Sequence, residues 1–248
     1  MLNITIVTRA HLNLMLIERQ KKWLSKLVLI LWLFTPYHIL PVQAERALGT
    51  LSGSVTITKR NGEIRKNHSD TVVFLHPTGD ENSLASPHSP PKISHKGSQF
   101  SPRVLPIVKN SAVDFYNDDN IFHNVFSLSI ANTFDLGIYP QGSSKIVTFE
   151  KFGLVKIYCN IHPKMVASIL VLNSPLYSLT DASGTYKIKG IPNGEYILSA
   201  WSELGGELSK KLYFQGGEKL IENFSLANTR LLTQHKNKFG KNYNSKYQ

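Results

Sequence analysis

Short runs of alternating or β-branched residues, separated by turn residues, most constrain what this chain can fold into. Such runs occupy residues 53–58, 71–75, 112–115 and 145–149, and Gly, Asn, Pro and Asp stand between them. No segment after residue 44 shows a sustained helical period. The sequence therefore predicts an all-β protein made of sandwiches or barrels of mainly antiparallel strands.

The first 44 residues are typical of an export signal. Cations up to Lys26 precede an apolar run at residues 27–34, and Val42-Gln43-Ala44 supplies small residues for cleavage after Ala44. The apolar run is far shorter than the roughly 20 residues that span a bilayer, so a cleaved signal is favoured over a retained anchor. We expect a periplasmic or secreted protein that keeps no stable membrane span after cleavage.

The net charge of +11 is concentrated at the two ends of the chain. Residues 1–44 contribute +4 and residues 230–248 contribute +5, which leaves +2 for the body. A nearly neutral body argues against nucleic-acid binding, which needs cations clustered on a folded face. We expect residues 228–248 to be a disordered basic tail, either inert or able to contact an anionic surface.

Cys159 is the only cysteine, and it begins the run Cys159-Asn160-Ile161-His162-Pro163-Lys164-Met165. In an exported protein a single cysteine has no disulfide partner within its own chain, so it forms a bridge to another chain, packs as a small hydrophobe or has a chemical role. A thiolate, an imidazole and a thioether at steps of three favour a metal site. Two His and one Cys with a weak axial Met describe a blue-copper centre, and His123 is the candidate for the second His.

The alternation of side chains along residues 153–159 predicts how this loop is attached. A period of two places Val155, Ile157 and Cys159 on one face and the residues between them on the other. We expect Cys159 to point inward at the end of a strand, and the following turn to return His162 and Met165 to the same point.

These residues carry a resemblance to a known family. The stretches Val113–Asp119 and His123-Asn124-Val125, followed by Cys159, His162 and Met165, resemble the cupredoxins of the plastocyanin and amicyanin group, and the short loop with Pro163 is similar to amicyanin. The resemblance covers residues 92–173 and implies a Greek-key β-sandwich or barrel. It implies one type 1 copper ion with His123, Cys159 and His162 as equatorial ligands and Met165 as the axial ligand. It also implies that Asn124 joins the two ligand segments and offers its backbone N–H to the sulfur.

Other polar residues are weaker candidates for a site. Asp118 and Asp119 lie between Asn117 and Asn120 and are interpreted as a turn. Common hydrolase motifs and the extra His clusters of multicopper oxidases do not occur in the sequence, so no enzyme activity is expected. A second metal site is a minor possibility for four further histidines: His68, His76, His88 and His95.

A second resemblance concerns the residues on either side of the cupredoxin-like block. Residues 180–201 contain the turns Asp-x-x-Gly-x-Tyr and Pro-x-Gly-x-Tyr and resemble carboxypeptidase regulatory-like modules, which are small transthyretin-like sandwiches. The first strands of such a module match residues 48–78. We therefore expect this sandwich to comprise residues 48–78 and 174–226, with residues 92–173 inserted. Its role is either docking to a partner or a structural platform.

Three functions are consistent with the sequence. The first is an exported mononuclear copper protein that carries electrons between redox proteins. The second is a copper-binding or copper-delivery protein, and the third is an envelope interaction protein with a structural copper site. The complete set of His123, Cys159, His162 and Met165 favours the first.

Overall fold

The computed structural model describes residues 47–79, 89–229 and 235–243. The expected signal peptide, His88 and parts of the expected tail lie outside these residues. The described residues form strands and no helix, so the expected all-β class is confirmed, and no helix among them is long and apolar enough to cross a membrane.

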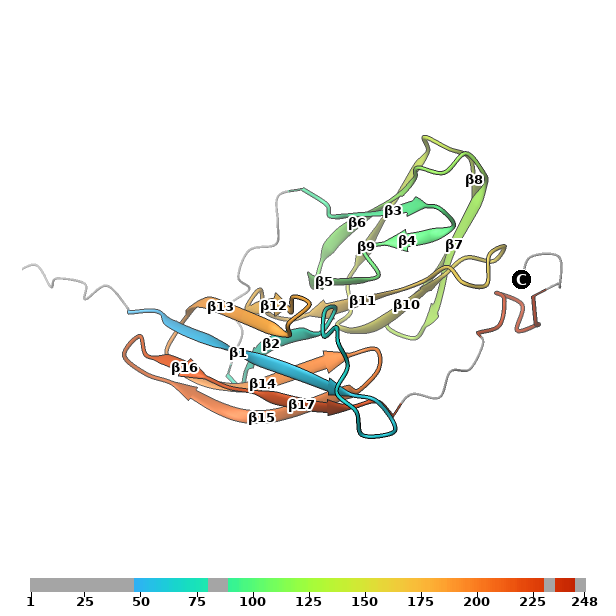
Figure 1. Ribbon diagram of the computed structural model, residues 1–248. Helices are drawn as coiled ribbons and strands as arrows, with labels where there is room; N and C mark the ends of the chain where they lie inside the picture. Colours follow the sequence, from blue (N-terminus) through green and yellow to red (C-terminus); the bar gives the residue numbers. More distant parts are fainter. Residues whose placement is uncertain (1–46, 80–88, 230–234, 244–248) are drawn as a thin grey trace, which may run out of the picture. The chain divides into compact units, whose positions relative to one another are not determined.

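The central sandwich is built from strands β3 to β11 (Figure 1). One sheet has the order β4-β3-β6-β9, and the other has the order β5-β11-β10-β7-β8. Most neighbours are antiparallel, while β3 and β6 and also β5 and β11 pair in parallel. The bounds of the nine strands are β3 Lys92–Lys96, β4 Gln99–Ser101, β5 Val104–Val108, β6 Ser111–Asn117, β7 His123–Ser129, β8 Asn132–Tyr139, β9 Ser144–Phe149, β10 Gly153–Tyr158 and β11 Val166–Leu172.

Alternating residues of the two sheets meet to form the core of the central sandwich. Phe115 of β6 and Phe149 of β9 are fully buried against Ile157 of β10 and Ile169 of β11. Burying such side chains removes large apolar surfaces from water, which is the main favourable term in folding. Cys159 and Met165 belong to the same cluster, so the candidate site lies at one end of this core.

The split sandwich contains strands from both sides of the central one. One sheet places β1 between β13 and β16, with β17 also pairing with β1, and the other has the order β12-β2-β14-β15. In Figure 1 the blue strand β1 accordingly lies among the orange and red strands. The bounds of the eight strands of the split sandwich are β1 Gly49–Thr58, β2 Val72–Pro77, β12 Tyr177–Leu179, β13 Thr185–Ile191, β14 Gly194–Ser202, β15 Gly206–Phe214, β16 Lys219–Ile221 and β17 Phe224–Ala227.

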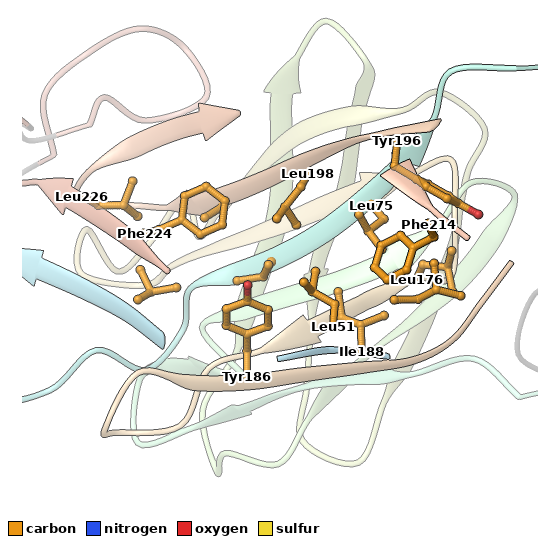
Figure 2. Close-up of a cluster of buried hydrophobic side chains, with 14 of the residues drawn as sticks. Leu51, Leu75, Leu176, Tyr186, Ile188, Tyr196, Leu198, Phe214, Phe224 and Leu226 are labelled. Atoms are coloured by element: carbon orange, nitrogen blue, oxygen red, sulfur yellow. The ribbon is translucent and has the colours of Figure 1, made fainter. Parts of the chain in front are cut away.

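The split sandwich has its own core, drawn in Figure 2. Leu51, Leu198 and Phe214 are fully buried in it. The turn before β13 packs closely against β1. Gly184 in this turn has φ +86°, and a Cβ atom there would lie 2.1 Å from the Val55 carbonyl oxygen. Only glycine fits both the left-handed backbone and this close approach.

One acidic residue joins the two sandwiches. Glu203, in the turn after β14, accepts hydrogen bonds from Arg103 Nε at 2.8 Å and from Lys156 Nζ, and Ser168 also contacts it. Burial alone would raise the pKa of Glu203, but the charges of Lys156 and Arg103 and the hydrogen bond from Ser168 lower that pKa to about 2. The carboxylate is therefore charged at neutral pH and attracts Lys156 of β10 and Arg103, which lies in the connection between β4 and β5.

Candidate metal centre

Strand β10 delivers Cys159 to the interior. Val155, Ile157 and Cys159 are fully buried, while Lys156 and Tyr158 are half-buried on the other face. This is the alternation that the period of two predicts. The chain then turns through residues 159–165, here called the ligand loop, and leaves as β11.

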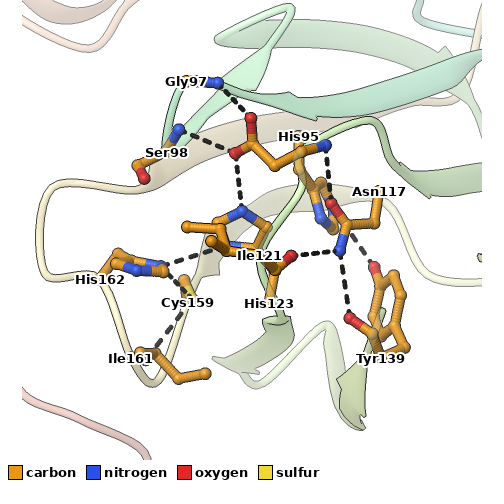
Figure 3. A network of polar contacts seen from close by, with 11 residues as sticks. His95, Gly97, Ser98, Asn117, Ile121, His123, Tyr139, Cys159, Ile161 and His162 are labelled. Atoms are coloured by element: carbon orange, nitrogen blue, oxygen red, sulfur yellow. Dashed lines mark hydrogen bonds and ion pairs between the residues drawn. The ribbon is translucent and has the colours of Figure 1, made fainter. Parts of the chain in front are cut away.

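Three potential ligand atoms converge at the end of the core. Cys159 Sγ lies 3.7 Å from His162 Nδ1, and His162 Nδ1 lies 3.1 Å from His123 Nδ1 (Figure 3). One sulfur and two nitrogen atoms thus lie within 4.8 Å of one another. His123 is the first residue of β7, so a strand and a loop from different parts of the chain supply the set.

Two of the three separations are close to what one metal ion requires. Metal–nitrogen and metal–sulfur bonds of about 2.0–2.3 Å place two ligand atoms of one ion roughly 3.3–3.8 Å apart. The distances of 3.1 and 3.7 Å are close to this range. His123 and Cys159 are fully buried and His162 is half-buried, so the site excludes most water. The donors present therefore fit a single transition-metal ion.

Met165 closes the ligand loop. Its side chain is fully buried in the cluster that contains Cys159. Its backbone carbonyl accepts a hydrogen bond from the Cys159 amide at 3.2 Å, and its own amide donates to the His162 carbonyl at 3.1 Å. These two bonds bring both ends of the ligand loop together, and Met165 remains the candidate for a fourth donor.

Asn124 ties strand β7 to the ligand loop. Its Oδ1 accepts a hydrogen bond from the Asn160 amide at 3.2 Å, while its Nδ2 donates to Asp135 Oδ1 at 2.7 Å and to the Gly137 carbonyl at 3.0 Å. Among the described residues, the backbone amide of Ile161 donates a hydrogen bond to Cys159 Sγ at 3.5 Å. The resemblance to cupredoxins implies the backbone amide of Asn124 as this donor.

Asp119 contacts the far side of the His123 ring. Its Oδ2 lies 2.7 Å from His123 Nε2, and its carboxylate also accepts hydrogen bonds from the amides of Gly97 at 2.6 Å and Ser98 at 2.9 Å. Burial would raise the pKa of Asp119, but these amides and His123 lower it, so the carboxylate is ionised. A carboxylate that holds the second nitrogen of a ligating histidine fixes its tautomer and orientation.

Sequence reasoning missed this role of Asp119, which it interpreted as part of a turn. The turn exists, because Asn117 Oδ1 accepts from the Asp119 amide at 3.0 Å. The overlooked signal is the acid four residues before a ligand histidine. Its two amide donors come from the turn between β3 and β4, which local spacing does not reveal.

The other described histidines have structural contacts. His95 is fully buried, its Nε2 lies 3.2 Å from Tyr139 Oη, and burial followed by the proximity of His123 lowers its pKa to about 3. His68 Nδ1 accepts a hydrogen bond from the Ile57 amide at 3.0 Å. The one group of ligand atoms found among the described residues is that of His123, Cys159 and His162.

His162 is the ligand candidate nearest the surface. It borders a depression of about 360 Å³ whose wall also includes Gln99, Arg103 and Lys164. Burial, and secondarily the neighbouring His123, lower the pKa of His162, so the ring is neutral at physiological pH and keeps a nitrogen lone pair for a metal.

Several solved structures are similar to this chain. A purple cupredoxin from Nitrosopumilus maritimus is 26% identical, with a TM-score of 0.30, over 33% of this chain and 99% of that protein. A copper-containing nitrite reductase from Thermus scotoductus SA-01 is 26% identical, with a TM-score of 0.34, over 41% of this chain and 26% of that protein. A mutant of amicyanin in the Cu(I) form is 15% identical, with a TM-score of 0.32, over 34% of this chain and 82% of that protein.

No family model and no curated protein matches the chain. The TM-scores are low, so the assignment of a metal to this site rests on the donors of this chain and on their geometry.

Proposed function

We propose that this protein binds one copper ion through His123, Cys159, His162 and Met165 and carries single electrons between redox proteins. The observation that supports this most strongly is the convergence of Cys159 Sγ and the two imidazole Nδ1 atoms, 3.7 and 3.1 Å apart, at the end of a buried core. Thiolate and thioether donors favour copper over hard cations such as magnesium and calcium.

A set of four donors leaves little room for a substrate at the ion. Bound copper would supply one-electron chemistry by alternating between Cu(I) and Cu(II). The residues of the chain hold the donors in place: Asp119 orients His123, Asn124 holds the loop, and strand β10 fixes Cys159. A rigid set of donors needs little rearrangement when the charge changes. We therefore propose electron transfer rather than catalysis.

His162 is the proposed point of electron entry and exit. His123 and Cys159 are fully buried, whereas His162 is half-buried beside the surface depression. A partner that docks over this depression comes closer to the ion through the His162 ring than through the other donors.

The setting of the protein is also part of the proposal. Residues 1–44 would direct export to the periplasm or the exterior, where a partner redox protein would donate or accept the electron. We propose no nucleic-acid partner, because the body of the chain carries only +2 of the net charge. The basic C-terminal residues would contact an anionic surface only weakly at physiological salt.

The test is the addition of Cu(II) to the purified full chain. We expect one equivalent to bind with an intense visible thiolate-to-copper absorption, a reversible one-electron potential, and loss of the band in Cys159→Ser. His76→Ala, in strand β2 of the split sandwich, is the control and should keep the band. Absence of the band, or its persistence in Cys159→Ser, would contradict the proposal.

The same experiment separates the alternatives. A delivery protein would bind copper and release it to an acceptor protein without a reversible potential. A structural site would give the band but exchange electrons with no redox partner, and its removal would lower the unfolding temperature of the protein.

A further inference from the structure

Residues 235–243 contact the ligand loop, although the sequence predicted a disordered tail over residues 228–248. This short C-terminal segment is drawn in red near the end of the chain in Figure 1. Side chains of this segment contact residues about 70 to 100 positions earlier in the chain, which no local sequence pattern reveals.

Tyr243 binds the first residue of the ligand loop. Its side chain is only 7% exposed, and its Oη donates a hydrogen bond to the Cys159 carbonyl at 2.7 Å. Burial, followed by the proximity of Cys159, raises the pKa of Tyr243, so the hydroxyl keeps its proton and acts as a donor.

His235 binds the other part of the same loop. Its Nε2 lies 2.6 Å from the Pro163 carbonyl and must carry the proton of that bond, since a carbonyl only accepts. Its ring stacks on Tyr158, with centroids 4.3 Å apart and planes at 30°, and meets the ring of Tyr243 edge-on at 5.2 Å. The two side chains therefore support each other beneath the loop.

Lys238 links the segment to the ligand loop and to strand β8. Its amide donates to Asn160 Oδ1 at 3.0 Å, and its Nζ lies 2.6 Å from Asp135 Oδ2. Asp135 and Asn160 are both partners of Asn124, the neighbour of His123. The segment thus contacts the network that joins the two ligand-bearing parts of the chain.

A local turn shapes the segment for these contacts. Asn237 Oδ1 accepts hydrogen bonds from the amides of Phe239 and Lys241, both at 3.0 Å, and Gly240 takes a φ of +72°. Such a turn returns the chain, so that His235 and Tyr243 lie on the same side.

We infer that the segment 235–243 is part of the metal centre, and that Tyr243 and His235 are positioning residues that hold the ligand loop in its metal-binding conformation. They touch no ligand atom. They act through the carbonyls of Cys159 and Pro163, whose placement sets the positions of the Cys159 sulfur and the His162 ring.

The inference rests on the metal site proposed above, but the holding of the loop can be tested without metal. The full-length Tyr243→Phe variant removes the hydroxyl that binds the Cys159 carbonyl and keeps the ring. In the metal-free protein, we expect the amides of residues 160–162, 164 and 165 to exchange hydrogen roughly tenfold faster in this variant, because a buried carbonyl loses its donor. Tyr213→Phe, at a tyrosine 59% exposed on β15, is the matched control and should leave exchange in the loop unchanged.

The copper-bound protein gives the second readout. Partners that orient metal ligands are typically worth about 10–100-fold in metal affinity. We expect Tyr243→Phe to bind Cu(II) about tenfold more weakly with an altered visible and electron paramagnetic resonance spectrum, and the double variant Tyr243→Phe with His235→Ala to show a larger change of the same kind.

Loop exchange at the wild-type rate in both variants, or an unchanged copper spectrum and affinity, would overturn the inference. A wild-type chain that binds no copper would overturn the proposed function instead, and hydrogen exchange in the metal-free chain would still decide whether the segment holds the loop. A drop in the unfolding temperature of Tyr243→Phe without faster exchange in residues 160–165 would also count against the inference, because it indicates a general structural role.

Discussion

The carboxylate of Asp119 lies 2.7 Å from Nε2 of His123, while Nδ1 of the same ring faces His162 at 3.1 Å. The two nitrogens of this buried imidazole therefore have separate partners. Nε2 is held by the Asp119 carboxylate, which two backbone amides fix in place. Nδ1 is left to bind a metal.

Replacing Asp119 by Asn should change the electronic properties of the site. The negative charge favours Cu(II) over Cu(I), so its removal is expected to raise the midpoint potential and weaken Cu(II) binding by about tenfold. Voltammetry and a competition titration measure the two effects. Asp118→Asn, at the exposed neighbour, is the control, and equal potentials for both variants would contradict the assigned role of Asp119.

Met165→Leu separates packing from ligation. The two side chains have similar volumes, so the free energy of unfolding of the metal-free protein should change by less than about 1.5 kcal/mol. Loss of the thioether should raise the midpoint potential of the copper protein and change its visible spectrum. Ile169→Leu, at a fully buried position of the same core, serves as the control, and spectra identical in both variants would exclude Met165 as a ligand.

Asn124→Ala should loosen the connection between β7 and the ligand loop. The substitution removes three hydrogen bonds and leaves the Asn160 amide without its partner, so we expect a loss of about 1–3 kcal/mol in the free energy of unfolding. Urea denaturation of the metal-free protein measures it. Asn132→Ala, which removes one exposed hydrogen bond to the Lys151 carbonyl, should cost less than half as much.

Glu203 should make stability depend on acidic pH. Its pKa is lowered to about 2 in the folded protein from an ordinary value of 4.5, so its contribution is fully present above the unfolded pKa and is lost as the pH falls from about 4.5 towards 2. The contribution is on the order of 3 kcal/mol. Glu203→Gln should remove this part of the acid dependence in unfolding curves measured between pH 5 and 2.5. A curve with the wild-type slope would contradict the assignment, and the nearby surface variant Glu207→Gln should retain that slope.

Local patterns in the sequence predicted the parts of the structure that local physics determines. The period of two from Val155 to Cys159 and the turn residues of the ligand loop depend on neighbouring residues, and the structure has both. Residue types alone point to His123 as the second imidazole, and the structure places its Nδ1 3.1 Å from His162 Nδ1.

The remainder depends on contacts between distant residues. Asp119 gains its role from amides in another strand pair, and Tyr243 gains its burial from the loop at Cys159. Neither has a sequence pattern of its own, because a single acid or tyrosine in a polar segment is usually a surface residue.

The pairing of β1 with β17 has a consequence for how the chain assembles. Val55 of β1 pairs with Phe224 of β17. Strand β1 is synthesised early, so it cannot complete this pairing until β17, one of the last strands, has been synthesised. The sheets of the central sandwich, in contrast, use only strands between β3 and β11 and can form as soon as those strands are available. Folding of that sandwich shortens the distance between the flanking segments and reduces the entropy cost of bringing them together. The order of synthesis therefore favours a complete ligand set before the surrounding strands close.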